Sequence, residues 1–210
     1  MILEACVDTL EEAMRAEQQG AHRIELCSRL DLDGLTPDLA LTQKVREAIK
    51  IPIHVMIRPM PNRFPDVFWY DESQIEEMIA SIEGFKQLDI QGFVAGALDQ
   101  NRMPDQRTMS RLAKATKGYN LTFHKAIDLA ADPVAALQGL KTVEGVTHVL
   151  TSGGASSASA GVPVLREMIR KSGSIRVIAA GGVTDQNLTE LHEQLGASEY
   201  HGKRIVGNLC

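Results

Sequence analysis

Strand-like and helical patterns alternate along the whole chain. Short apolar runs have the length of strands, and the longer stretches between them have helical periodicity. The strands are predicted at residues 2–6, 23–27, 53–59, 92–98, 121–124, 147–151, 175–180 and 198–201. The helices are predicted at residues 9–19, 37–49, 71–88, 105–117, 132–141, a stretch ending near 171, and 184–195. Strands that alternate with helices in this way predict a parallel sheet with crossover helices.

Eight strands and seven helices predict one α/β domain over residues 1–210, a (β/α)8 TIM barrel. An open doubly wound sheet is the alternative, but such sheets usually have fewer strands. Only nine residues follow the last predicted strand, so the eighth helix is expected to be short or missing. The apolar tail at 204–210 could pack against the uncovered side of the barrel, or against a second subunit in a homo-oligomer.

Composition narrows the class of protein. The chain is 44% hydrophobic and 23% charged, which is typical of a soluble globular protein. Its net charge of −5 and the lack of a dense Lys/Arg run argue against nucleic-acid binding. The sequence has neither a signal-peptide pattern at its start nor an apolar stretch of membrane-spanning length. Three scattered cysteines argue against a disulfide framework, so we expect a cytoplasmic protein with reduced thiols.

Polar side chains recur inside five predicted strands, two or four residues apart. Such spacing places both side chains of a pair on one face of the strand. One buried polar residue is easily explained by an ion pair or a satisfied core histidine, because burial without a partner is costly. Five strands with the same pattern predict one shared pocket where barrel strands end. The pairs are Glu4 with Cys6, Glu25 with Cys27, His54 with Arg58, Thr122 with His124, and Glu199 with His201.

These polar residues separate into two layers. Those nearest the strand ends are Cys6, Cys27, Arg58, His124 and His201. One layer deeper are the three glutamates, which we expect to pair with Arg58 or to orient a histidine: Glu4, Glu25 and Glu199.

Cys6 and Cys27 end neighbouring predicted strands at positions that match, each two residues after a glutamate. Adjacent strands lie about 4.8 Å apart, so both thiols could contact one soft metal ion. Thiolates suit Cu(I), and together with His124 or His201 they would also suit zinc. The alternative is that both cysteines only fill space, since cysteine is among the most buried residue types.

The order of motifs along the chain resembles the copper homeostasis protein CutC family. The resemblance implies a TIM barrel, a role in copper handling, and Cu(I) bound by Cys6 and Cys27. The chain differs at its C-terminus, where many relatives continue into a further helix. The motifs that carry the resemblance are Glu4 with Cys6, the segments 23–27, 34–37 and 57–59, the segment 122–124 with Asp128, and the segments 150–153 and 180–182.

A copper site leaves other residues of the predicted pocket unexplained. An arginine in a barrel mouth usually binds a carboxylate or a phosphate, so Arg58 is a candidate anion anchor. The second hypothesis is therefore an enzyme that acts on a small phosphate- or carboxylate-bearing metabolite. His124 would be its general acid or base, with help from nearby carboxylates and a second histidine. Those helpers are Glu25, Asp128, Glu199 and His201. A purely structural module fits these polar strands poorly.

Two pairs of glycines follow the sixth and seventh predicted strands: Gly153 with Gly154, and Gly181 with Gly182. Glycines allow backbone amides to approach an anion, and the last loops of this fold often hold phosphate. Glycines also form tight strand–helix turns, which is the alternative. A further loop at 59–70 contains the only tryptophan, and it suits a lid, a packed surface loop or a dimer contact.

Overall fold

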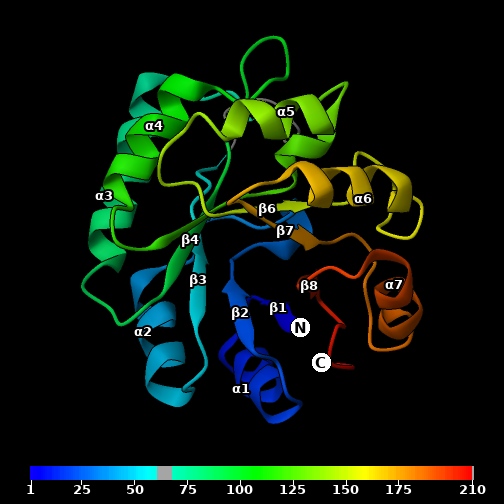
Figure 1. The fold of residues 1–210 in the computed structure, drawn as a ribbon. Helices are drawn as coiled ribbons and strands as arrows, with labels where there is room; N and C mark the ends of the chain where they lie inside the picture. Colours follow the sequence, from blue (N-terminus) through cyan, green and yellow to red (C-terminus); the bar gives the residue numbers. More distant parts are fainter. Residues whose placement is uncertain (61–67, 210) are drawn as a thin grey trace.

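Eight parallel strands close into a barrel in the computed structural model, which describes residues 1–60 and 68–209 (Figure 1). Each strand pairs with the next one along the chain, and β8 closes the barrel by pairing with β1. The predicted TIM barrel is confirmed. Its strands are β1 (Ile2–Val7), β2 (Arg23–Leu26), β3 (Ile53–Met56), β4 (Gly92–Ala95), β5 (Asn120–Phe123), β6 (His148–Thr151), β7 (Arg176–Ala179) and β8 (Glu199–Gly202).

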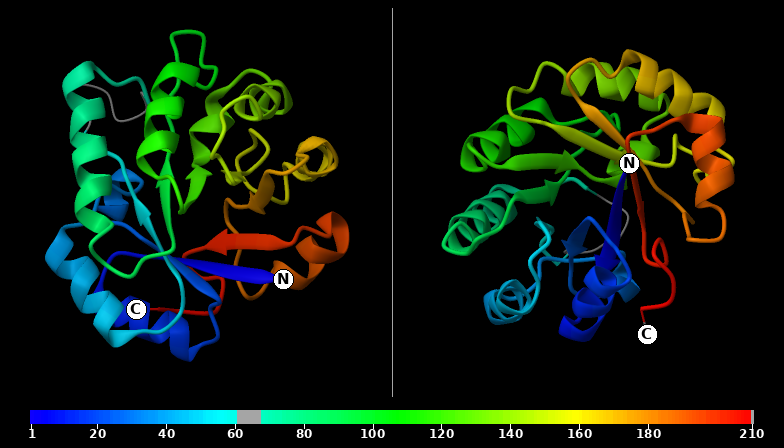
Figure 2. Two further views of the ribbon diagram at one scale, coloured as in Figure 1. Left: turned by 60° about the vertical axis from the view of Figure 1, so that its left-hand side comes forward. Right: turned by 60° about the horizontal axis from the view of Figure 1, so that its bottom comes forward.

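Seven α-helices in the described part of the chain lie outside these strands (Figure 2). They are α1 (Leu10–Gln18), α2 (Leu39–Ala48), α3 (Glu72–Phe85), α4 (Gln106–Ala115), α5 (Pro133–Leu140), α6 (Val162–Lys171) and α7 (Leu188–Leu195). Two short 3-10 helices, which the sequence pattern does not predict, lie at the strand ends: η1 (Leu30–Leu32) and η2 (Lys125–Leu129). No helix of the described residues is both long and apolar enough to cross a membrane.

Local sequence signals explain where these helices begin and end. Thr9 accepts a hydrogen bond from the Glu12 amide at 3.1 Å and so caps α1. Asp71 and Gln74 form a reciprocal capping box at the start of α3. At the other end of a helix, Gly196 terminates α7 with a positive φ of 59°. Each helix is therefore set by its own ends and then packs on the barrel.

Two predicted strands are shorter than expected. The runs at 53–59 and 92–98 stay in the sheet only as far as Met56 and Ala95. The Ile57 amide still donates to Val94 of β4 at 2.7 Å, but further along both runs the backbone bonds to loops. The Arg58 amide donates to Thr36 Oγ1 at 2.9 Å, and the Leu98 amide donates to the Phe68 carbonyl at 2.8 Å. The ends of these apolar runs therefore form the rim of the barrel mouth.

The C-terminal segment replaces an eighth helix. No helix follows β8 up to residue 209, and the buried side chains of Ile205 and Leu209 pack into the hydrophobic core. Arg15 of α1 donates to the Leu209 carbonyl at 2.8 Å, which ties the tail across the side between α7 and α1 (Figure 2). The predicted absence of the last helix is confirmed, and the described tail packs on the barrel.

Alternation of side chains along each strand creates two cores. Outward side chains such as Ile24 and Leu26 pack against the helices. Inward side chains fill the barrel itself, where two small apolar groups are separated by polar residues. The first contains Cys27, Met56 and Val94, and the second contains Leu150, Ile178 and Ala180. The polar side chains between and around them form the candidate site.

Candidate functional site

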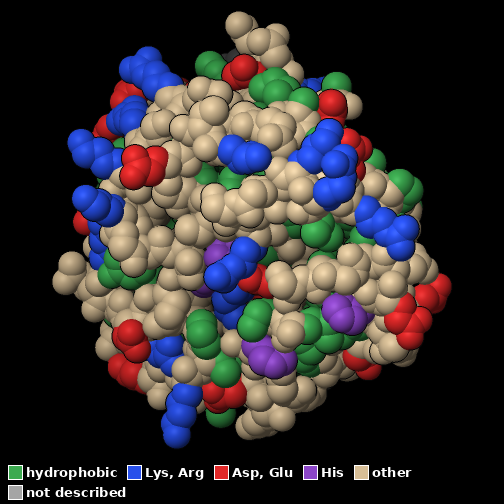
Figure 3. Space-filling model, in the orientation of Figure 1, with side chains coloured by type: hydrophobic (Ala, Val, Ile, Leu, Met, Phe, Trp, Pro, Cys, Tyr) green, Lys and Arg blue, Asp and Glu red, His purple; other side chains and the backbone are tan. Residues whose placement is uncertain are grey.

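A pocket of about 310 Å³ opens at the C-terminal ends of the strands. It contains seven of the residues predicted as site residues: Cys6, Glu25, Cys27, Arg58, His124, Asp128 and His201. Its remaining lining is Asp33, Met56, Phe68, Lys125, Ala126, Leu129 and Leu150. The structure thus brings the five predicted strand-end residues together in one pocket, along with Glu25 and Asp128. On the surface in Figure 3, basic, acidic and histidine side chains gather near the centre of the face, while most other Lys and Arg lie towards its edges.

The register between β1 and β2 differs from the predicted one. Cys6 lies opposite Glu25, and Cys27 lies two residues further along the chain, directly after the end of β2. The two cysteines therefore do not occupy matching positions. Nevertheless both thiols line the pocket, and a hydrogen bond from Cys27 is the main reason that the pKa of Cys6 falls to about 6. The same contact, with burial, raises the pKa of Cys27 well above its usual value.

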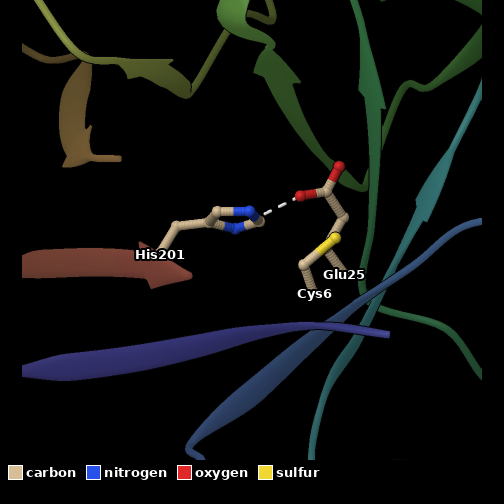
Figure 4. A group of neighbouring side chains, drawn as sticks. All are labelled: Cys6, Glu25 and His201. Carbon is tan, nitrogen blue, oxygen red and sulfur yellow. Dashed lines mark ion pairs between the residues drawn. The ribbon is translucent and has the colours of Figure 1, made fainter. Parts of the chain in front are cut away.

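Cys6, Glu25 and His201 come from three adjacent strands, β1, β2 and β8, and converge on one point (Figure 4). Their sulfur, oxygen and nitrogen atoms all lie within 4.8 Å of one another. His201 Nδ1 lies 2.8 Å from Glu4 Oε1 and 3.2 Å from Glu25 Oε2. The Cys27 thiol is 3.8 Å from Glu25 Oε1. A thiol pair and a carboxylate–imidazole pair thus share one end of the pocket.

The charges of this group depend on each other. Burial alone would lower the pKa of His201, but the neighbouring Glu25 and Glu4 and the bond to Cys6 raise it well above its usual value. Burial raises the pKa of Glu25 to about 8, against the opposing effect of the His201 charge. At neutral pH the group therefore combines a thiolate at Cys6 with an imidazolium at His201.

A buried ionic layer lies directly beneath the pocket. Arg23 Nε is 2.5 Å from Glu4 Oε2, and Arg23 Nη2 is 2.6 Å from Glu199 Oε2. His148 Nε2 lies 3.4 Å from the other oxygen of Glu199. Burial opposes ionisation, but Arg23 and the histidines hold the pKa of Glu4 far below its usual range and the pKa of Glu199 at about 2. Of the two roles expected for the three glutamates, pairing with Arg58 is wrong, because Glu4 and Glu199 pair with Arg23. The expected contacts with histidines are present: His201 lies against Glu4 and Glu25, and His148 lies against Glu199.

This layer also shows which residues the sequence argument missed. Glu199 does not line the pocket, so its predicted help in catalysis would have to act through other groups. Arg23 and His148 are not among the predicted site residues, although strand alternation in the sequence indicates that both side chains point inward. Arg23 lies two residues before Glu25 and therefore shares its inward face. In the same way, His148 shares the inward face with Leu150 of the barrel interior.

Two glycines, Gly92 in β4 and Gly96 directly after it, make room for two histidine rings. A Cβ atom on Gly92 would lie 2.6 Å from His54 Cδ2, and one on Gly96 would lie 2.7 Å from His124 Cε1. Both contacts are too short for any side chain. The absence of a side chain at Gly92 thus leaves space for His54 in the lower layer, and its absence at Gly96 leaves space for His124 in the pocket wall. The sequence pattern alone did not indicate this.

Arg58 is held from two sides. Its Nη1 atom donates to the carbonyls of Leu32 at 2.8 Å and Gly34 at 3.2 Å. Its guanidinium carbon also lies 4.8 Å from the ring centre of Phe68, in a cation–π contact. The side chain is only 4% exposed, yet it contributes to the pocket lining. Arg58 therefore fixes the loop after β2 and places a permanent positive charge at the pocket wall.

His124 has a defined tautomer. Its Nδ1 atom accepts a hydrogen bond from the Ala126 amide at 3.2 Å, so the proton resides on Nε2. Burial, with the nearby charge of Arg58, lowers the pKa of His124 to about 3, so the ring is neutral at pH 7. The buried Nε2 atom has no hydrogen-bond partner among the described residues. His124 therefore contributes to the pocket lining beside the ring of Phe68, while its unsatisfied Nε2–H donor is buried.

Asp128 and the glycine loops have mainly an internal role. The Asp128 carboxylate accepts bonds from the amides of Ser152 and Gly154, at 3.0 and 2.9 Å, and from the hydroxyls of Thr151 and Ser152. The Gly154 amide predicted to face an anion therefore already faces this carboxylate. None of the four predicted glycines lines the pocket, and all have positive φ, which supports the turn-forming alternative: Gly153, Gly154, Gly181 and Gly182.

The predicted lid at 59–70 is only partly visible. Residues 61–67 lie outside the described residues, so the lid stays a prediction. Of the rest, Phe68 contributes to the pocket wall and contacts both Arg58 and His124. Trp69 is 61% exposed.

The fold and site define a (β/α)8 barrel with a thiol-bearing, charged pocket at the carboxyl ends of its strands. Comparison with known protein families shows which family the chain belongs to. A sequence model of the CutC family matches residues 1–206, so this chain belongs to the CutC family. The resemblance noted in the sequence is thereby confirmed.

Individual relatives agree with this assignment. The human copper homeostasis protein cutC homolog is 41% identical over 201 residues, which cover 95% of this chain and 72% of the human one. A CutC family protein of Glaesserella parasuis is 41% identical over 202 residues, covering 96% of this chain and 81% of the relative. This is a family of copper homeostasis proteins.

Solved structures show the same fold. The crystal structure of the copper homeostasis protein CutC from Streptococcus agalactiae superposes with a TM-score of 0.89 at 25% identity, over 98% of this chain and 99% of that one. An N-acetylneuraminate lyase from Mycoplasma synoviae reaches a TM-score of 0.66 at 15% identity, over 99% of this chain and 70% of the lyase. The second likeness concerns the barrel fold alone.

Proposed function

We propose that this chain is a cytoplasmic copper homeostasis protein whose cargo is one Cu(I) ion bound by Cys6 and Cys27. The observation that carries the proposal is the pair of thiols that line one pocket. Soft thiolates select Cu(I) over the harder ions of the cell. The copper-related names of the relatives support the same cargo.

The surroundings of the thiols favour Cu(I) over zinc. Zinc would need a third and a fourth ligand, for which His201 and Glu25 are the nearest candidates. The two carboxylates beside His201 Nδ1, however, raise the pKa of this histidine well above its usual value, and a protonated imidazole has no lone pair for a metal. Two thiolates alone satisfy Cu(I), and the resulting complex carries one negative charge. The imidazolium of His201 is placed to balance that charge, so it serves the copper complex without being a ligand.

The test is a Cu(I) titration of the reduced, full-length chain without oxygen, in competition with a chromogenic Cu(I) chelator. We expect one equivalent of tightly bound Cu(I) in the wild type. The Cys6→Ala, Cys27→Ala double variant should lose this equivalent, whereas Cys210→Ala keeps both proposed ligands and should retain it. Unchanged binding in the double variant would refute the proposal.

A second candidate function is an enzyme that acts on a small phosphate- or carboxylate-bearing metabolite. The specific observation is the unsatisfied Nε2–H donor of His124, close to the charge of Arg58. A neutral ring whose Nδ1 atom is occupied is a poor general base, so the geometry favours Glu25 with His201 for proton transfer. His124 and Arg58 would then bind the anionic group of the substrate.

Thermal denaturation in the presence of metabolites tests this second candidate. Phosphorylated or carboxylated compounds should raise the melting temperature of the wild type, and Arg58→Met should remove the increase. A broad screen that produces no shift would argue strongly against an enzyme of this kind.

A further inference from the structure

Side chains that carry sulfur come from three neighbouring strands at the barrel mouth. Cys6 lies near the end of β1, Cys27 directly follows β2, and Met56 is the last residue of β3. All three contribute to the lining of the pocket, and Met56 is the only methionine among the described residues of that lining. A copper site at the two cysteines therefore leaves a third sulfur of the same pocket without an assigned role.

The pairing of β2 with β3 sets Met56 beside Cys27. Leu26 lies opposite Val55, so the next position along both chains places Cys27 opposite Met56. Neighbouring strands are about 4.8 Å apart, so side chains that lie opposite each other on one face come into contact. Cys27 is on the inward face, because Glu25 two residues earlier also lines the pocket. The register thus brings a thioether next to a thiol at the strand ends.

The space beside Gly34 shows how closely the two side chains approach each other. A Cβ atom on Gly34 would lie 3.2 Å from Cys27 Sγ and 3.7 Å from Met56 Cε, the methyl carbon that is bonded to the thioether sulfur. Cys27 and Met56 also belong to one buried apolar group inside the barrel, and Cys6 packs against that group. The thioether and both thiols therefore share one end of the pocket.

Methionines elsewhere in the core have a different setting. Met78, Met109 and Met168 are almost completely buried in the outer core, where a flexible side chain fills irregular gaps. Met56 lies apart from that core, in the barrel interior and on the wall of the pocket. Its sulfur is a soft donor of the kind that binds Cu(I) in proteins. Because a thioether is uncharged, it adds no negative charge beside Glu25, as a third thiolate would.

We propose that Met56 is a third ligand of the copper ion, so that Cu(I) is bound by the sulfur atoms of Cys6, Cys27 and Met56. This inference rests on the proposed copper site at the two cysteines. The cysteines bind as thiolates and release their protons to the solvent, whereas the thioether donates a lone pair and has no proton to release. Copper stays Cu(I), and the complex keeps the single negative charge that His201 balances. Because a soft thioether binds harder cations weakly, the third ligand also strengthens the preference of the site for Cu(I).

X-ray absorption at the copper edge tests the inference, because it distinguishes selenium from sulfur among the neighbours of the ion. The full-length chain is prepared with selenomethionine in place of methionine, reduced, and loaded with one Cu(I) without oxygen. We expect one selenium and two sulfur neighbours in the wild type. Met56→Leu should lose the selenium and keep both sulfurs, whereas Met109→Leu should retain all three neighbours.

Competition with a chromogenic Cu(I) chelator measures what the third ligand contributes to affinity. Met56→Leu removes the sulfur at nearly constant side-chain volume, so the fold is preserved. Even groups that only orient metal ligands change metal affinity by about 10–100-fold when they are mutated, so the loss of a direct ligand should weaken Cu(I) binding at least about tenfold. Met109→Leu is the matched control, because it makes the same substitution at a fully buried methionine outside the pocket, and its Cu(I) affinity should equal that of the wild type.

Three results would overturn the inference while leaving the copper site at the cysteines intact. One is a copper ion with two sulfur neighbours and no selenium in the labelled wild type, and another is unchanged Cu(I) affinity in Met56→Leu. The third is a selenium neighbour that persists in that variant, which would assign the ligand to another methionine. Failure of the wild type to bind Cu(I) at all would instead refute the copper site on which the inference rests.

Discussion

The barrel interior contains two polar layers that differ in how their charges are satisfied. In the lower layer Arg23 neutralises Glu4 and Glu199 at 2.5 and 2.6 Å, and all three side chains are buried. In the pocket above, both thiols line an open space of about 310 Å³, and His124 contributes to the same lining. Both layers use inward positions of the same strands, only two residues apart.

The difference separates structure from function in a set of residues that look alike in the sequence. A buried ion pair with complete partners needs no ligand and is explained by the fold. A buried donor or thiol that faces a cavity is costly unless something binds there. The Arg23 ion pairs of the lower layer therefore support the barrel, although both ring nitrogens of His54 in that layer are buried without a hydrogen-bond partner among the described residues. The upper layer lines the open pocket and is where a ligand is expected.

The largest effect should come from breaking the lower layer. Arg23→Met leaves two buried carboxylates without their cation, which should lower the free energy of unfolding by about 3–5 kcal/mol. Urea denaturation followed by circular dichroism measures this change. Arg111→Met is the control, since Arg111 pairs with Glu72 and Glu76 on the surface, and it should change stability little. Similar losses in both variants would contradict a special role for the lower layer.

A smaller effect is expected at Gly92, which leaves space for the ring of His54 in the lower layer. Gly92→Ala puts a Cβ atom 2.6 Å from His54 Cδ2, so either the ring or the strand must shift. We expect a destabilisation of about 1–3 kcal/mol, typical of overpacked cores. In Gly139→Ala the new methyl group, within α5, meets no atom within 4 Å, so helix propensity should stabilise that variant by about 0.5–1 kcal/mol. If Gly92→Ala is as stable as the wild type, the His54 ring does not require a glycine at position 92.

A further effect, spread over several pH units, is a pH dependence that both layers share. Burial lowers the pKa of both His54 and His124 to about 3. Below about pH 6.5 these two histidines therefore bind more protons in the unfolded chain than in the folded one, and their contribution to stability falls as the pH drops from there towards 3. Each histidine contributes a slope of at most about 1.4 kcal/mol per pH unit.

Urea denaturation at several pH values between 7 and 4.5 tests this linkage. His124→Asn removes one of the two histidines and should flatten the pH dependence of the free energy of unfolding. Parallel curves for the wild type and the variant would show that His124 is not held neutral by burial, which would also weaken its assignment as a fixed donor.

The sequence was sufficient for the fold and for the inventory of the site. Strand alternation placed Cys6, Cys27 and Arg58 on inward faces, and the barrel rule placed their ends in one mouth. Both inferences rest on local periodicity, which each segment carries by itself. The family resemblance added copper as the expected cargo, and the whole-chain match to the CutC family agrees with it.

The partners of these residues depended on the tertiary structure. The register that sets Cys6 opposite Glu25, and the pairing of Arg23 with two glutamates, join strands that are distant in the chain. No local pattern encodes such offsets, because they result from closing all eight strands at once. The hydrogen bond that the Asp128 carboxylate accepts from the Gly154 amide likewise depends on the tertiary structure. Periodicity decided which side chains point inward, and barrel closure decided which of them are satisfied and which still face open space.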